Sequence, residues 1–203
     1  YYGMYCEALK KLIPDSSEDP PFVALMANGT SGDINNIDFR NPRKSKGPYT
    51  QMRYVADDVA AKVHGALASL TWTATAPLSA RYRELDVKWR TIEPELLAWA
   101  KETEAKTPRI QGKADLPLAY AGRVQRLATP SPETKLPVQA LRIGDLALTA
   151  IPNEVYALTG LRLKSQSPFP HTFNLSLANG AEGYIPPPEQ HALGGYTTCP
   201  PRT

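Results

Sequence analysis

The sequence predicts an α/β fold in which a mixed sheet is flanked by helices and the active-site loops follow the strand ends. The first observation is "FVALMA" (22–27), a continuous apolar run typical of a strand covered on both faces. The second is "PVQALRIGDLALTAIP" (137–152), where two β-type runs surround Gly144-Asp145, as in a hairpin. The third is a stretch at 49–70 whose apolar residues recur with helical spacing, which predicts a long amphipathic helix.

Three further helices follow from the same periodicity. Apolar residues at helical spacing predict a helix over 2–13. A second is expected over 91–105, with Thr91 as N-cap and acidic residues in the first turn. A third is expected over 153–166, beginning at Asn153.

Alternating apolar and polar residues predict two more strands and the buried face of the hairpin. Partial alternation predicts an exposed strand over 78–89, and a β-rich run predicts another over 172–180. If the hairpin belongs to the central sheet, four of its apolar side chains should be partly or wholly buried: Leu141, Ile143, Leu146 and Leu148.

Composition narrows the function class. The chain has 203 residues, 42% apolar and 21% charged, which is typical of a soluble globular domain. The formal net charge is +3, without a basic helix face, which disfavours a nucleic-acid partner. No apolar run is long enough to span a membrane. Cys6 and Cys199 form neither a disulfide framework nor a cysteine zinc site.

The loop that follows the first apolar run has two interpretations. "NGTSGD" (28–33) reads either as an ordinary strand-ending turn or as a loop whose small groups face a substrate. A dinucleotide fingerprint does not fit its spacing, and no Lys-Ser/Thr follows Gly32 as a phosphate loop requires.

Two residues near later strand ends could ligate a metal, and each has a structural alternative. Glu154, in "IPNE", either complements a helix dipole or is a metal ligand at the carboxyl end of a sheet. Tyr184 is either a packed aromatic with a hydrogen-bonded hydroxyl or part of the same site. The histidines do not form an HxH or HExxH pair: they are His64, His171 and His191.

Together these segments resemble the neutral/alkaline (non-lysosomal) ceramidase family, in particular its shorter bacterial members. In that family the hairpin and helix read close to "GD....IPGE", matched here by Gly144-Asp145 and 151–154. A later segment reads close to "N.Y..Y..T.EEY....YE", matched by Asn179, Tyr184, Glu189 and Tyr196. The resemblance covers nearly the whole chain and is most specific over 22–36 and 144–196.

The resemblance implies a zinc-dependent amidohydrolase that cleaves the N-acyl bond of ceramide, a lipid amide. The family's zinc is held by two histidines, a glutamate and a tyrosine. Glu154 matches the glutamate ligand and Tyr184 the tyrosine ligand, while neither His64, His171 nor His191 matches a ligand motif.

The same resemblance makes residues 1–203 part of a single catalytic domain whose N-terminal portion is missing. The missing histidine ligands belong to motifs on the N-terminal side of Tyr1. That agrees with residue 1 lying inside a helical pattern without an N-cap. The family also suggests a secreted or periplasmic protein.

The loop departs from the family at one position. Ceramidases read close to "G[DN][VL]SPN", with a serine three residues after the glycine as the proposed nucleophile or zinc-site partner. Here Gly32-Asp33-Ile34 is followed by Asn35, which cannot act as a hydroxyl nucleophile but could hydrogen-bond a carbonyl or a metal-bound water. Ser31, on the other side of the turn, is an alternative hydroxyl. We take Asn35, Asp33 and Ser31 as the catalytic candidates.

The sequence is compatible with three functions. The first is a zinc amidohydrolase acting on a lipid or other small amide. The second is a related domain without catalysis that binds a lipid or a glycan, which Asn35 favours. The third is a nucleotide- or phosphate-binding domain using the "NGTSGD" loop, which the absent lysine disfavours.

Overall fold

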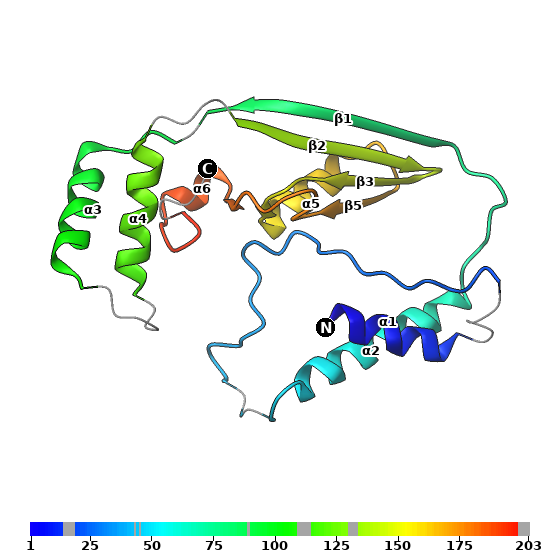
Figure 1. Ribbon diagram of the computed structural model, residues 1–203. Helices are drawn as coiled ribbons and strands as arrows, with labels where there is room; N and C mark the ends of the chain where they lie inside the picture. Colours follow the sequence, from blue (N-terminus) through cyan, green and yellow to red (C-terminus); the bar gives the residue numbers. More distant parts are fainter. Residues whose placement is uncertain are drawn as a thin grey trace. The chain divides into compact units, whose positions relative to one another are not determined.

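A mixed four-stranded sheet in the order β1-β2-β3-β5 confirms the expected α/β class. β1 pairs antiparallel with β2, and β2 with β3, whereas β3 and β5 run parallel (Figure 1). The strands are β1 (Leu78–Val87), β2 (Thr134–Ile143), β3 (Leu146–Ala150) and β5 (His171–Leu175).

The computed structural model describes residues 1–13, 19–42, 44, 46–88, 90–108, 115–129 and 134–198. By its contacts the chain divides into two compact units. Unit 1 comprises 1–27 and 35–75, and unit 2 comprises 28–34 and 76–203.

The β2–β3 hairpin forms where the sequence predicts it. Ile143 pairs with Leu146, so Gly144-Asp145 is a two-residue connection. Gly144 has a φ of +59°, which a glycine adopts without the steric cost that a Cβ would bring.

The prediction that four apolar side chains of this hairpin are buried is wrong for two of them. Leu141 and Ile143 are 38% and 45% exposed, while Leu146 and Leu148 are half-buried. The side chains alternate across the sheet, and Ala147, on the opposite face, is the buried residue of β3. The covered face is therefore the other one.

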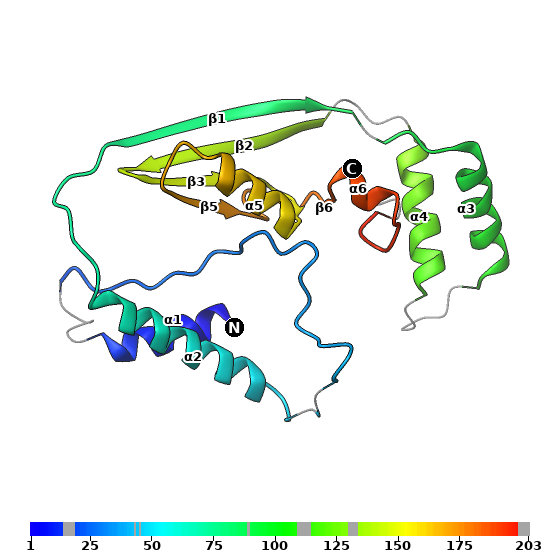
Figure 2. The ribbon, with the colours of Figure 1, turned by 180° about the vertical axis from the view of Figure 1, so that it is seen from behind.

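Helix α5 (Ala157–Gln166) covers that other face and lies against β5 (Figure 2). Asn174 is buried and donates from Nδ2 to the Gly160 carbonyl at 3.0 Å. Thr149, its neighbour in register on β3, donates to Asn174 Oδ1 at 2.8 Å. This polar chain ties α5 to the two parallel strands.

The segment expected as a helix from Asn153 instead begins with a short strand. β4 (Glu154–Val155) pairs in parallel with β6 (Tyr184–Ile185), and α5 begins only at Ala157. Because Glu154 lies on a strand, the helix-dipole interpretation of its carboxylate is wrong. Helix α6 (Pro188–His191) follows β6.

The rest of unit 2 includes a pair of packed helices, α3 (Pro94–Lys106) and α4 (Leu116–Ala128). They share a small core of fully buried side chains: Ala100, Ala121 and Val124. The N-cap of α3 is Glu93, so the assignment of Thr91 is wrong. Asp115 begins α4, accepting from the Leu118 amide at 2.9 Å.

In unit 1, α1 (Tyr2–Leu12) packs against α2 (Thr50–Leu67), close to the bounds that periodicity predicts. Their shared core consists of Tyr5, Leu9, Ala56 and Ala60.

The prediction of a strand at 22–27, covered on both faces, is wrong. Phe22, Ala24 and Met26 pack against the α1–α2 core, but Val23 and Leu25 are 74% and 77% exposed. A strand needs a hydrogen-bonded neighbour. No such partner for this segment occurs in the described part of the chain, so it is extended without being a strand.

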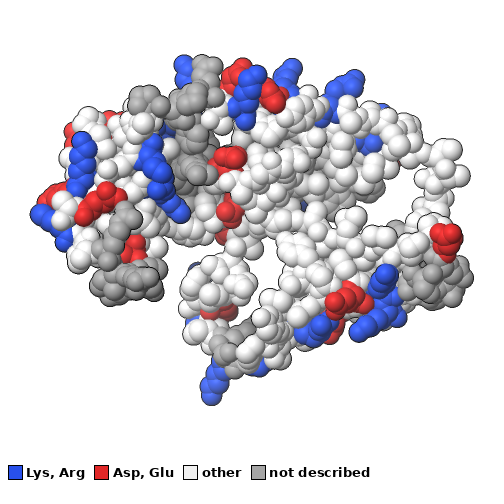
Figure 3. Space-filling model, in the orientation of Figure 1, with Lys and Arg blue, Asp and Glu red and all other residues white. Residues whose placement is uncertain are grey.

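The surface agrees with the mild net charge. On the face drawn in Figure 3, basic and acidic side chains are interspersed. None of the helices within the described ranges is long and apolar enough to cross a bilayer. Cys6 is a free thiol, and Cys199 lies outside the described residues.

Candidate metal and active site

Glu154 and Tyr184 face each other across the β4–β6 pair. The register joins Glu154 with Tyr184 and Val155 with Ile185. Partners in register on neighbouring parallel strands project to the same side, so both oxygen-bearing side chains share one face. Both are half-buried.

The two parallel strands of the main sheet bring these residues together. β3 and β5 are neighbours. β3 is followed within a few residues by β4, and β5 is followed by the turn that leads to β6. Five backbone hydrogen bonds of 2.7–3.1 Å join the segments. They are Ile151 N to Leu175 O, Ala178 N to Ile151 O, Leu177 N to Asn153 O, Glu182 N to Pro152 O, and Glu154 N to Gly183 O.

The phenol of Tyr184 is held in its neutral form. Burial, followed by hydrogen bonding to Glu154 and to Tyr196, raises the pKa of Tyr184 well above its usual value of 10.0. The ring of Tyr196 meets that of Tyr184 edge-on, with centroids 5.6 Å apart. At neutral pH the Tyr184 hydroxyl therefore carries its proton beside the Glu154 carboxylate.

Asn153, next to Glu154 in sequence, is fully buried. Its Nδ2 donates to the Gly183 carbonyl at 3.3 Å, while its Oδ1 has no hydrogen-bond partner among the described residues. A buried polar atom left in this state is unfavourable, and a water, an ion or a ligand can satisfy it.

The glycine loop lies directly on the strand that carries Glu154. The Gly32 amide donates to Val155 O at 2.8 Å, and a Cβ on Gly32 would lie 2.8 Å from Glu154 O. Glycine is required here because only a residue without a side chain allows two backbones to approach so closely. This contact makes the loop more than a turn that ends a strand.

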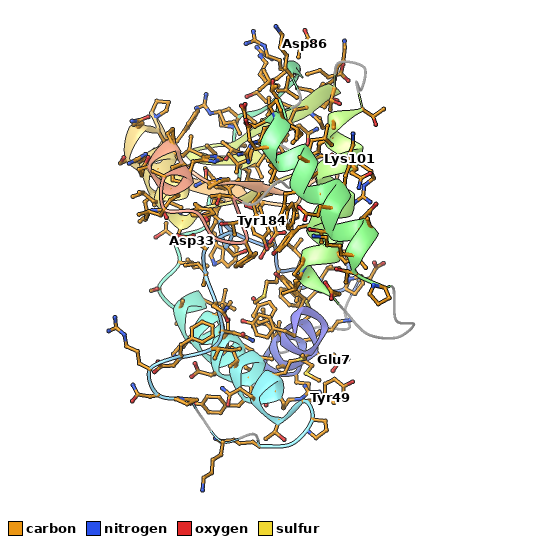
Figure 4. All side chains as sticks on the ribbon, turned by 90° about the vertical axis from the view of Figure 1, so that its left-hand side faces the viewer. Glu7, Asp33, Tyr49, Asp86, Lys101 and Tyr184 are labelled. Atoms are coloured by element: carbon orange, nitrogen blue, oxygen red, sulfur yellow. The ribbon has the colours of Figure 1, made fainter. Side chains whose placement is uncertain are left out.

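Two of the three catalytic candidates, Asp33 and Ser31, belong to this loop (Figure 4 labels Asp33 and Tyr184). Asp33 Oδ1 accepts from the Ala157 amide at 2.7 Å, at the beginning of α5. Ser31 Oγ is hydrogen-bonded to the Asn28 amide group, at 3.2 Å from Nδ2.

The third candidate, Asn35, lies in the exposed stretch that follows. Its Oδ1 accepts from the Ile37 amide at 3.1 Å, closing a local turn. Asn35 belongs to unit 1, whereas Glu154 belongs to unit 2.

The three histidines lie on three different elements. His64 is half-buried on α2, whereas His171 and His191 are exposed at the start of β5 and the end of α6. Among the residues that the structure describes, no three of His, Cys, Asp and Glu gather closely enough to hold a metal.

The two remaining motif residues make surface contacts. Glu189 pairs with Arg162 at 2.7 Å, and Asn179 donates to Gln139 Oε1 at 2.8 Å. A hydrogen bond from its own backbone amide, and then the one from Arg162, lower the pKa of Glu189.

The sequence did not predict the contacts that hold the segment around Tyr196. The Tyr156 hydroxyl is hydrogen-bonded to Thr197 Oγ1, and both residues are buried. Arg90 donates to the Thr198 carbonyl at 3.0 Å. A tyrosine immediately after a strand is a weak signal, because it is equally common as a packed aromatic.

The fold resembles that of solved ceramidases. A crystal structure of neutral ceramidase from Pseudomonas aeruginosa matches with a TM-score of 0.60 and 20% sequence identity. A structure described as ceramidase complexed with C2 matches with a TM-score of 0.59 and 18% identity. Each match covers 94% of this chain.

This chain spans about a third of the length of those structures, 36% and 37% respectively. No protein-family model matches the sequence, and no curated protein matches it. At such low identity the likeness shows a shared fold.

Proposed function

We propose that this chain is part of the catalytic domain of a zinc-dependent amidohydrolase that cleaves the N-acyl bond of a lipid amide of the ceramide type. The observation that carries the proposal is the register of Glu154 with Tyr184 on one face of β4–β6. The shared fold with ceramidases supports the substrate class.

The donor set fits half of a zinc site. Zinc accepts carboxylate oxygen, and it prefers four ligands in tetrahedral geometry. Glu154 and Tyr184 would supply two oxygen ligands, and we propose that two histidines outside these 203 residues supply the others. A zinc ion in such a site polarises a carbonyl and lowers the pKa of bound water to about 7.

The chain's own residues would control a proton at this site. Tyr184 holds its proton because burial and the neighbouring Glu154 carboxylate disfavour the phenolate. Use of Tyr184 as an anionic ligand therefore requires release of that proton. Zinc affinity should then rise with pH, since a metal competes with protons for its ligands.

The three catalytic candidates differ in the chemical group that each could offer a substrate. Ser31 offers a hydroxyl, which the Asn28 side chain holds in place. Asn35 offers an amide that can hydrogen-bond a carbonyl, and Asp33 offers a carboxylate already occupied by the Ala157 amide. We therefore propose Ser31 rather than Asp33 as the group of the glycine loop that contacts the substrate, and we keep Asn35 as a candidate on the sequence alone.

Zinc titration of the 203-residue chain, followed calorimetrically, tests the ligand assignment. We expect weak binding that disappears in Glu154→Ala and weakens in Tyr184→Phe. Glu182→Ala is the matched control, since it removes a carboxylate only two residues from Tyr184. Equal zinc affinity in Glu154→Ala and the unmodified chain would overturn the assignment.

The longer protein tests the reaction. It should hold about one zinc per chain and release a fluorescent fatty acid from a labelled N-acyl sphingoid base. Glu154→Ala should lose both the metal and the hydrolysis, because a carboxylate bound directly to the metal is not replaced by solvent without large loss.

Asn35 supports a second function, a ceramidase-like domain that binds a lipid or glycan without hydrolysing it. A protein that binds the labelled lipid and zinc but releases no fatty acid would favour this alternative. The phosphate-binding function is not favoured, because the Gly32 amide already donates to Val155 O and so is not free to bind an anion.

A further inference from the structure

The strand that carries Glu154 is too short to hold its own position. β4 and β6 are two residues each, and among the described residues they form a sheet only with each other. A two-stranded ribbon, even a longer one, is at best marginally stable in water. The position of the Glu154 carboxylate therefore depends on contacts from outside this ribbon.

The other face of the ribbon borders a partly open pocket. Val155, which is buried, and Ile185 project to the side opposite Glu154, and both line this pocket of about 290 Å³. Thr30, from the glycine loop, lines the same pocket. Side chains therefore fill the space behind the ribbon only in part.

The glycine loop supports the other end of β4 through consecutive contacts, in addition to the backbone bonds that join 151–154 to 175–183. Gly32 N donates to Val155 O at 2.8 Å, and Asp33 Oδ1 accepts from Ala157 N at 2.7 Å. These two bonds flank Tyr156, whose hydroxyl is bonded to Thr197, the residue after Tyr196. One loop thus fixes the backbone on both sides of a residue that also positions the Tyr196 segment.

The Asp33 carboxylate is a favourable acceptor for the first amide of α5. A carboxylate next to the first amides of a helix both accepts a hydrogen bond and complements the helix dipole. α5 offers no side-chain cap of its own at Tyr156, so Asp33 supplies from a distant segment what the helix lacks locally.

We propose that Asp33 is a positioning residue, not a catalytic one: through Ala157 it fixes the β4 backbone and so holds the Glu154 carboxylate against Tyr184. This inference rests on the proposed function for its meaning in catalysis. The mechanical part of it, the coupling of Asp33 to Glu154, holds with or without a metal or a substrate.

Amide hydrogen exchange in the full chain, read by NMR at the Glu154 amide, tests the coupling. This amide donates to Gly183 O, a bond that Asp33 does not touch. Asp33→Ala should accelerate its exchange about ten-fold, the equivalent of one hydrogen bond to a charged group. The Val124 amide in α4 should keep its rate, since it reports on stability elsewhere in unit 2.

Two variants separate positioning from other roles. Asp33→Asn keeps an acceptor oxygen at the same distance from the backbone, so it should keep the Glu154 exchange close to the native rate. Asp38→Ala is the matched control, because Asp38 accepts the Arg40 and Asn41 amides in a loop of unit 1. It should leave the Glu154 amide unchanged.

Three exchange results would overturn the proposal. They are an unchanged Glu154 amide in Asp33→Ala, an equal acceleration at Val124, and an Asp33→Asn variant that behaves like Asp33→Ala. Loss of hydrolysis in Asp33→Asn with native exchange would make Asp33 catalytic and would likewise overturn it. If the exchange results hold while the native protein releases no fatty acid, the positioning stands and the proposed function fails.

Discussion

Glu154 and Tyr184, thirty residues apart in sequence, are register partners on adjacent parallel strands. Their closeness arises from the parallel pairing of β3 and β5, which returns the chain to the same sheet edge after the α5 crossover. Open α/β sheets bind their ligands at the carboxyl ends of such strands. The pair is thus a product of topology rather than of a local motif.

Alkaline pH should destabilise the protein partly through Tyr184. Its folded-state pKa lies above the unfolded value of about 10, so the folded state binds the proton more tightly. The stabilisation is complete below pH 10 and is lost as pH rises through the folded pKa. Urea midpoints measured from pH 8 to 11 should fall more steeply for the native chain than for Tyr184→Phe. Parallel curves would contradict this, since Tyr5 and Tyr82, whose pKa values are also raised, remain in both proteins.

Gly160→Ala should destabilise unit 2 although alanine favours helices. A Cβ at Gly160 would lie 2.8 Å from Thr30 Cγ2, a collision that forces the loop away from α5. Overpacking of this kind costs about 1–3 kcal/mol, which exceeds the gain in helix propensity of about 1 kcal/mol at most sites.

Gly65→Ala, in α2, is the matched control because nothing lies within 4 Å of its added Cβ. It should stabilise the chain by up to about 1 kcal/mol. Thr30→Gly should rescue Gly160→Ala in thermal denaturation. A double variant no more stable than Gly160→Ala would show that the collision is not the cause.

Leu9→Ala should strongly destabilise the α1–α2 pair. Leu9 is 4% exposed, and truncation of a buried leucine costs about 2–5 kcal/mol. Leu12→Ala, on the same helix but 40% exposed, should cost much less. Denaturant midpoints followed by circular dichroism compare the two, and equal losses would contradict the assigned core.

If the proposed amidohydrolase function holds, Asn35→Ser in the longer protein should preserve or raise amide hydrolysis, because serine adds a hydroxyl at this position. Serine can also accept the Ile37 amide, so the local turn survives. Asn35→Leu should depress the rate without unfolding the protein. If both variants hydrolyse the labelled lipid at the native rate, Asn35 does not contact the substrate.

Periodicity and turn chemistry predicted the elements that depend on local sequence. The Gly144-Asp145 hairpin and the α1 and α2 helices required only a glycine at a turn or an apolar stripe. The register of Glu154 with Tyr184 was not predicted, because it depends on two short strands, and only the resemblance linked these two residues.

The predictions that failed concern segments whose secondary structure depends on tertiary contacts. The run at 22–27 has strand composition but lacks a paired strand within the described ranges. The start of α5 moved from Asn153 to Ala157 because Glu154 and Val155 pair with β6 instead. Helix α4 was missed although its signals were present, namely Asp115 as cap and Pro117 in the first turn.

The extended segment at 22–26 has a practical consequence for handling this protein. Val23 and Leu25 present apolar side chains on a stretch whose backbone is not part of a sheet among the described residues. Such a stretch is a template on which another copy can add a strand, and natural proteins guard such edges with charge. The 203-residue chain should accordingly be prone to self-association when concentrated. Val23→Lys or Leu25→Lys should reduce this self-association, because a charge disfavours strand addition and each side chain faces away from the α1–α2 core.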